Sequence, residues 1–141
     1  MCHRESHREA VMNYGMRIDV ERGFDETVAM VREALAENGF GVLTEIDVKS
    51  TLKDKIDVDV DEQIILGACN PHFAHQALQV EPSIGALLPC NVVVRTTQGA
   101  TVVEAIDPAT LVAVTENPDM EPLAEQVSVA LKAALDRVAL A

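Results

Sequence analysis

Apolar and polar side chains alternate along several short stretches of the chain, the pattern of a half-buried β-strand. Residues 14–20 and 40–48 show this alternation and predict two strands. Residues 64–69 are continuously apolar and predict a central strand that ends before Asn70 and Pro71. The first half of the sequence therefore predicts three strands.

Two further β-rich runs, residues 90–97 and 100–107, flank the dipeptide Gln98-Gly99. A pair of residues of this type fits a tight turn, so the two runs predict a β-hairpin. A two-residue turn also fixes which residues face each other across the hairpin. The expected pairs are Val94 with Val103, Val92 with Ala105, and Cys90 with Asp107.

Helical spacing of apolar residues predicts three helices. One covers residues 25–38 and ends at Gly39, and a second covers residues 71–80 and starts with a proline at its first position. The third follows Asn117-Pro118 and carries a stripe of Leu123, Val127, Leu131, Leu135 and Val138. Residues 50–55 predict a short capped helical turn, residues 57–63 an exposed acidic connection, and residues 81–89, interrupted by proline and glycine, a loop.

The resulting order is strand, helix, strand, strand, helix, hairpin, helix. It predicts an α+β fold with two layers, an antiparallel or mixed sheet with helices packed on one face. A chain of 141 residues forms a single domain, which we place at residues 14–141, after a flexible extension at residues 1–13. The other face of such a sheet stays partly apolar, which favours a homodimer.

The charge balance excludes whole classes of partner. Acidic residues outnumber basic ones by 23 to 11, giving a net charge of −12. A field of this sign repels nucleic acid and anionic membrane surfaces. No apolar run approaches the roughly 20 residues that cross a bilayer, and the charged N-terminus is unlike a signal peptide, so a cytoplasmic protein is expected. The three cysteines are an odd number and predict thiols rather than disulfides.

Three motifs together resemble one family: residues 40–49, residues 65–71 with Gly67-Ala68-Cys69-Asn70-Pro71, and residues 87–94 with Pro89-Cys90-Asn91. In this order they are similar to the bacterial and archaeal domain of unknown function 302 family, over about residues 14–139. The resemblance implies a two-layer α+β fold like that of the TATA-box-binding protein, commonly dimeric. The activity of the family is not established, so the resemblance supplies no catalytic residues and leaves any cofactor unknown, and a shared fold does not imply DNA binding.

Cys69 and Cys90 are the first candidates for chemistry. Cys69 ends one predicted strand and Cys90 begins another, so antiparallel neighbours would bring them together at one rim of the sheet, with Asn70 and Asn91 beside them. Paired thiols bind soft metals, carry a persulfide or cycle through a disulfide. Free cysteine also packs as a small buried residue, which is its more common role.

A metal site is a weaker candidate. His72 and His75 follow Cys69 at intervals of three residues, and zinc binds such ligands with Cys90 as a fourth. Two histidines on the exposed face of a short helix are the more common arrangement. Cys2, His3 and His7 have ligand-like spacing too, but they fall in the N-terminal extension.

Two further positions complete the candidates for ligand binding. Lys49 and Lys53, together with Lys55, form a basic island at a strand-to-helix junction where an anion would bind, although neighbouring aspartates would neutralise it. Asp107 would act beside Cys90 as a base, although Asp107-Pro108 also opens turns.

The sequence leaves the function open between two classes. It lacks a glycine-rich phosphate loop, a nucleophile-elbow serine and a CxxC pair, the usual signs of common enzymes. The leading hypothesis is a homodimeric domain that binds a small molecule or anion at Cys69-Asn70-Pro71 and Pro89-Cys90-Asn91. The alternative is a thiol- or metal-dependent enzyme, or a sulfur or redox carrier, that uses Cys69 and Cys90.

Overall fold

The computed structural model describes residues 13–140. Its centre is a five-stranded sheet in the order β1-β5-β4-β3-β2, in which all neighbours run antiparallel. The strands are β1 (Gly15–Val20), β2 (Gly41–Asp47), β3 (Gln63–Cys69), β4 (Cys90–Thr97) and β5 (Ala100–Ile106). The first strand of the chain thus lies beside the last one.

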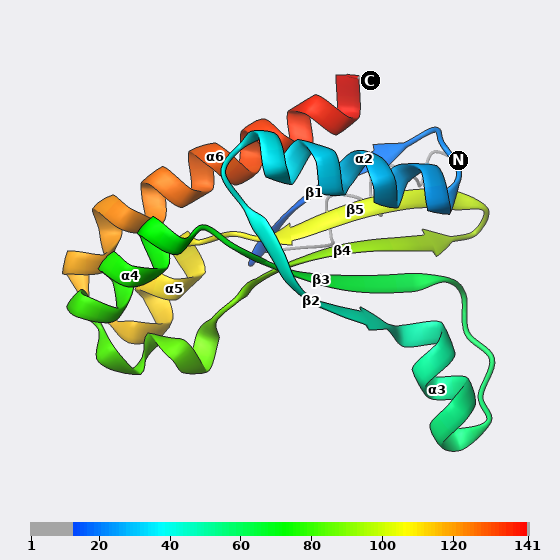
Figure 1. Ribbon diagram of the computed structural model, residues 1–141, viewed down its shortest axis with the longest axis horizontal. Helices are drawn as coiled ribbons and strands as arrows, with labels where there is room; N and C mark the ends of the chain where they lie inside the picture. The colour runs from blue at the N-terminus through cyan, green and yellow to red at the C-terminus, as the bar shows by residue number, and fades with distance from the viewer. Residues whose placement is uncertain (1–12, 141) are drawn as a thin grey trace.

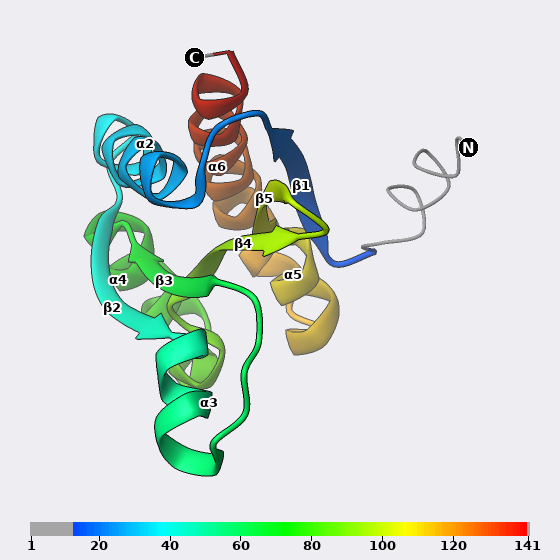
Figure 2. The same cartoon turned by 90° about the vertical axis from the view of Figure 1, so that its right-hand side faces the viewer.

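The helices are α2 (Phe24–Glu37), α3 (Val48–Ile56), α4 (Pro71–Val80), α5 (Ala109–Thr115) and α6 (Glu121–Leu140), with two 3₁₀ helices, η1 (Pro82–Leu87) and η2 (Pro118–Met120). Figure 1 shows α2 and α6 on one face of the sheet. Seen from the side, no helix of the described residues lies across the middle of the opposite face (Figure 2). The expected α+β fold, with a sheet and helices in two layers, is confirmed.

Strand alternation explains which residues form the main core. The even-numbered positions of β3 and β4, such as Leu66, Val92 and Val94, point toward the helices and are fully buried. They pack against Leu35 of α2 and Leu131 of α6. Burying aliphatic side chains of this size stabilises the fold by about 1.5–3 kcal/mol each.

The predicted hairpin register is confirmed for the residues that pair between β4 and β5. Val94 pairs with Val103 and Val92 with Ala105. The ladder does not reach the expected pair of Cys90 with Asp107, because β5 ends at Ile106. Cys90 instead pairs with a residue of the other neighbouring strand, Ala68 of β3.

Three segments depart from the expectations. Residues 81–89 are not simply a loop, since Pro82 begins the 3₁₀ helix η1, and proline is compatible with a first helical position. The short turn expected at residues 50–55 is a nine-residue helix, α3. The helix α5, which has no apolar stripe long enough to reveal it, was not predicted at all.

The expected N-terminal extension, with Cys2, His3 and His7, lies outside the described residues except for residue 13. Among the residues that the structure describes, no helix has the length and apolar character needed to cross a membrane.

Candidate functional site

The two cysteine motifs meet at one end of the sheet. Cys69 is the last residue of β3 and Cys90 is the first residue of β4. Because these strands are antiparallel, Cys90 pairs with Ala68, the residue that precedes Cys69. Both cysteines are free thiols and line the same cavity. The structure therefore brings together the two sulfur-bearing segments that are far apart in the chain.

A glycine allows this close approach. A Cβ atom on Gly67 would lie 2.7 Å from Cγ of Pro89 and 2.1 Å from Oγ1 of Thr44. Any side chain at this position would therefore push Pro89, and with it Cys90, away from β3. Gly67 thus fixes how the segment before β4 lies against the end of β3.

The cavity lies between this end of the sheet and a cap of helices. Its walls are mainly apolar, and its volume is about 50 Å³. The sheet wall contributes Ala68, Cys69 and Cys90, and the helical wall contributes residues of α4, η1, α5, η2 and α6: Phe73, Ala74, Ala77, Ile84, Leu111, Met120, Leu123, Ala124 and Val127. In Figure 1 these helices close the left-hand end of the sheet.

The size of the cavity limits what it can hold without rearrangement. A single water needs roughly 10–15 Å³, and an apolar cavity of roughly 150 Å³ holds benzene. Pockets for metabolites of drug size have roughly 300–1,000 Å³. A cavity of about 50 Å³ therefore accepts a few atoms, an ion, or the tip of a longer molecule.

Cys90 keeps its proton at neutral pH. Burial, with a smaller contribution from the charge of Cys69, raises the pKa of the Cys90 thiol to about 11. A thiolate is the nucleophilic form of cysteine, so Cys90 is a poor nucleophile in this state.

Asn70 has a structural task at the rim. Its Oδ1 accepts hydrogen bonds from the backbone N–H groups of His72 (3.0 Å) and Phe73 (3.2 Å), which caps α4. Its Nδ2 lies beside Gly39, where a Cβ atom would approach it to 2.9 Å. Gly39 has a φ of +87°, so glycine is favoured there on both counts. The oxygen of Asn70 is thus occupied by the helix cap.

Two candidates near the rim do not line the cavity. Asn91 is exposed and follows Cys90, so its side chain points to the opposite face of β4. The carboxylate of Asp107 accepts a hydrogen bond from the Ala109 N–H (3.0 Å). The backbone N–H of Asp107 donates to the Tyr14 carbonyl (2.8 Å). The turn interpretation accounts for Asp107, and its neighbour Pro108 forms part of the cavity wall.

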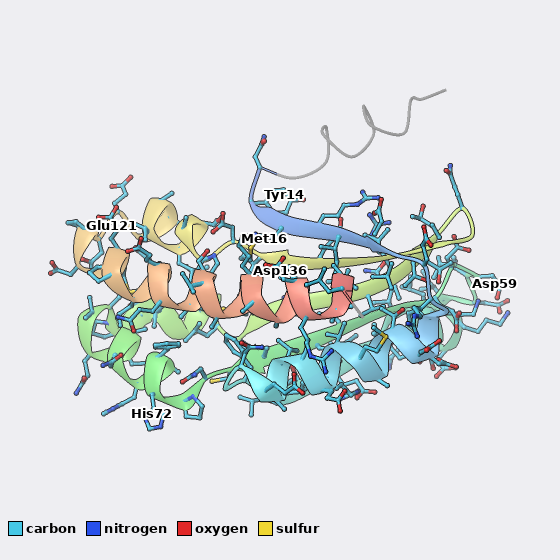
Figure 3. The ribbon with its side chains drawn as sticks, turned by 90° about the horizontal axis from the view of Figure 1, so that it is seen from above. Tyr14, Met16, Asp59, His72, Glu121 and Asp136 are labelled. Carbon is cyan, nitrogen blue, oxygen red and sulfur yellow. The ribbon has the colours of Figure 1, made fainter. Side chains whose placement is uncertain are left out.

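His72 and His75 do not join the cysteines. Both are exposed on α4, and Figure 3 shows the His72 side chain pointing away from the body of the protein. Within residues 13–140, no group of three or more histidine, cysteine, aspartate or glutamate side chains is placed to hold a metal ion. The four-ligand zinc arrangement of Cys69, His72, His75 and Cys90 is therefore not formed.

Lys49 and Lys53 lie at the other end of the sheet. They belong to α3, which follows the end of β2 where Asp47 pairs with Ile64, whereas Cys69 pairs with Gly41. Lys49 donates a hydrogen bond to the Val60 carbonyl (2.8 Å). Lys53 forms ion pairs with Asp57 (2.8 Å) and Asp59 (3.6 Å). Two members of the basic island, Lys49 and Lys53, are thus engaged by the chain's own acceptors.

Sequence reasoning missed the parts of the helical wall that η1, α5 and η2 supply. Met120 and Ile84 are buried there, at 2% and 0% exposure, yet neither belongs to a long amphipathic stripe. The available signal was weak: isolated apolar residues between prolines and glycines in segments that otherwise look like loops. Only the packing of α4, η1 and α5 against α6 brings these residues to the same cavity.

Comparison with known proteins places the chain in a family. Residues 16–138 match the sequence profile of the family described as domain of unknown function DUF302. A crystal structure of an uncharacterized conserved DUF302 protein from Bacillus stearothermophilus is similar, with 31% identity and a TM-score of 0.85, over 90% of this chain and 99% of that one. No curated protein matches. The sequence profile and this shared structure agree, and the chain belongs to the DUF302 family.

Proposed function

We propose that this protein is a binding domain whose cavity at the cysteine end of the sheet takes a small ligand. The observation that carries the proposal is the cavity itself, which is mainly apolar and has two thiols and the Asn70 amide in its wall. A few polar groups in an apolar enclosure orient a ligand while burial supplies affinity. Its volume of about 50 Å³ favours a ligand of a few non-hydrogen atoms, or the tip of a longer one.

A cavity-filling variant tests this proposal. Ala124 of α6 lines the cavity and is 5% exposed, so Ala124→Leu would occupy the space. Ala133→Leu, on an exposed position of the same helix, is the matched control. Xenon NMR and thermal-shift assays with small apolar molecules and thiols should show binding to the wild type and to Ala133→Leu, and none to Ala124→Leu. Equal binding in Ala124→Leu, or none in the wild type, would reject the cavity as a site.

A second candidate function is thiol chemistry at the same cavity, either as an enzyme or as a sulfur or redox carrier. It is supported by the presence of Cys69 and Cys90 in one wall, where Cys90 pairs with Ala68, the residue that precedes Cys69. Because Cys90 retains its proton, Cys69 would be the attacking sulfur. In a Cys2→Ser background, iodoacetamide labelling at pH 7 should modify Cys69 faster than Cys90. Equal rates at the two positions would end this candidate.

The open face of the sheet supports a homodimer. This face carries Ile65 and Val93, which stay partly exposed. It also carries the ion pair of Arg17 with Asp19 (3.3 Å), in which the Asp19 side chain stays 38% exposed. A patch with apolar residues and both charges can be complementary to itself in a symmetric contact between two copies.

Sedimentation over a wide range of concentration tests the dimer. Val93→Glu would place a charge in the centre of the open face and should shift the protein to monomer. Val129→Glu changes an exposed residue of α6 on the other side of the molecule and should leave association unchanged. A wild type that is monomeric throughout, or a Val93→Glu variant that still associates, would exclude the open face as the interface. The free thiols suit a cytoplasmic setting for such a dimer.

A further inference from the structure

Three sulfur-bearing side chains line the cavity, from three segments that are distant in the chain. Cys69 ends β3, Cys90 begins β4, and Met120 ends η2. Thiolate and thioether sulfurs are soft donors that select soft metal ions such as Cu(I). The remaining walls are mainly hydrocarbon, and they offer a hard cation almost no oxygen ligands.

The size of the cavity favours an ion over an organic ligand. Metal–sulfur bonds are about 2.3 Å long, so an ion bound to sulfur donors in the wall needs little space beyond the donors themselves. The volume of about 50 Å³ suffices for one ion but falls short of a metabolite. Zinc prefers four ligands in a tetrahedron, and no such group exists among residues 13–140.

The helix α4 supplies a favourable field at Cys69. Cys69 directly precedes the N-cap Asn70, and Phe73 and Ala74 in the first turns of this ten-residue helix line the cavity. The N-terminus of a helix carries a partial positive charge that stabilises nearby anions. A metal-bound thiolate at Cys69 is therefore stabilised by the end of this helix. This stabilisation matters because the cavity is apolar and the chain has a net charge of −12.

We propose that the cavity binds one soft monovalent cation of the Cu(I) or Ag(I) class, through the sulfurs of Cys69 and Cys90 with the Met120 thioether as third donor. The proposal rests on the proposed binding cavity and names a ligand class for it. On binding, the two S–H bonds break and two protons pass to solvent. Three metal–sulfur bonds form, two to the thiolates and one to the Met120 thioether, and the ion releases the solvent or chelator ligands that it carried. No electron is transferred, and the ion with its two thiolates carries one negative charge.

Proton release gives the site a distinctive pH dependence. While both thiols are protonated in the free protein, the release of two protons makes the affinity rise about 100-fold per pH unit.

Anaerobic titration of the Cys2→Ser protein with Cu(I) or Ag(I) against a competing chelator tests the proposal. The Cys2→Ser background leaves Cys69 and Cys90 as the cysteines of the chain. One ion should bind per chain, with thiolate-to-Cu(I) absorption in the ultraviolet. Cys69→Ser or Cys90→Ser should each weaken binding by about 100-fold or more, and Met120→Leu by about 10-fold. Met30→Leu, on α2 outside the cavity, should bind like the parent.

The outcomes separate this proposal from the proposed function. An absence of metal binding, or an affinity unchanged by Cys90→Ser, overturns the soft-cation site. If xenon and small apolar molecules still enter the cavity in that case, the binding domain stands and its ligand is organic. If Ala124→Leu changes neither the binding of xenon nor that of the metal, both proposals fail, because neither ligand occupies the cavity.

Discussion

The two ends of the sheet differ in how far helices cover them. At one end, β3 and β4 meet α4, η1, α5 and the start of α6, and side chains of the strands and helices line one mainly apolar cavity (Figure 1). At the other end, β2 continues into α3, which projects from the sheet and has no buried residues (Figure 2). Figure 3 shows His72 near the first end and Asp59 at the second.

The same residue types behave differently at these two ends. Ile84 is 0% exposed in the cavity wall, whereas Ile56 at the end of α3 is 63% exposed. Polar groups differ as well: the Cys90 thiol is desolvated, while Lys53 is paired in solvent with two aspartates. Burial, rather than residue identity, decides where unusual chemistry is possible, and it favours the cavity end.

Truncation of an isoleucine at each end should give the largest contrast. Ile84→Ala removes a fully buried side chain and should lower the free energy of unfolding by about 3–4 kcal/mol, since it leaves a cavity. Ile56→Ala should change it by about 0.5 kcal/mol or less. Urea denaturation measures both. Losses of similar size would mean that the helical cap does not hold the cavity end closed.

Glycine substitutions should give the next largest effect. Gly67→Ala forces a Cβ atom against Pro89 and should destabilise the fold by about 2–3 kcal/mol. Gly41→Ala on β2 is the control, because its Cβ atom would lie 4.0 Å from the Cys69 carbonyl oxygen, an ordinary contact. Thermal and urea unfolding provide the comparison. Tolerance of alanine at Gly67 would contradict the close packing of Pro89 on β3.

Alkaline pH should weaken the cavity end through Cys90. Its pKa is about 11 when folded and about 9 when unfolded, so the folded state holds the thiol proton more tightly. The stability this provides is fully present below pH 9 and is lost as the pH rises to 11. The loss amounts to about 2–3 kcal/mol. Unfolding free energies at pH 8 and pH 11 should differ more for the wild type than for Cys90→Ala, and parallel pH profiles would refute the shift.

Helix caps at the two ends should differ by the smallest amount. Asn70 accepts two backbone hydrogen bonds at the start of α4, and Asn70→Ala should cost about 1–2 kcal/mol. Asp47 accepts one, from Ser50 (2.9 Å), at the start of the exposed helix α3, and Asp47→Ala should cost about 0.5–1 kcal/mol. Denaturation midpoints of the two variants make the comparison. A larger loss for Asp47→Ala would show that α3 is more tightly coupled to the fold than its exposure indicates.

Local signals in the sequence predicted the strands, the long helices and the hairpin register, because alternation and helical spacing involve residues close in the chain. The cap at Asn70 and the turn at Asp107 could be predicted for the same reason. The rim pairing of Cys69 and Cys90 required one further inference, that β3 and β4 are antiparallel neighbours, and the ladder between them bears this out.

The sequence by itself thus determined which segments form strands and helices and which residues stand at their ends. The tertiary structure alone decided that β1 lies beside β5, that Met120 and Ile84 face the cysteines across one cavity, and that Lys53 is neutralised by Asp57 and Asp59. The reason is physical: local periodicity records the nearest neighbours along the chain, whereas a cavity forms only where several distant segments close around the same volume.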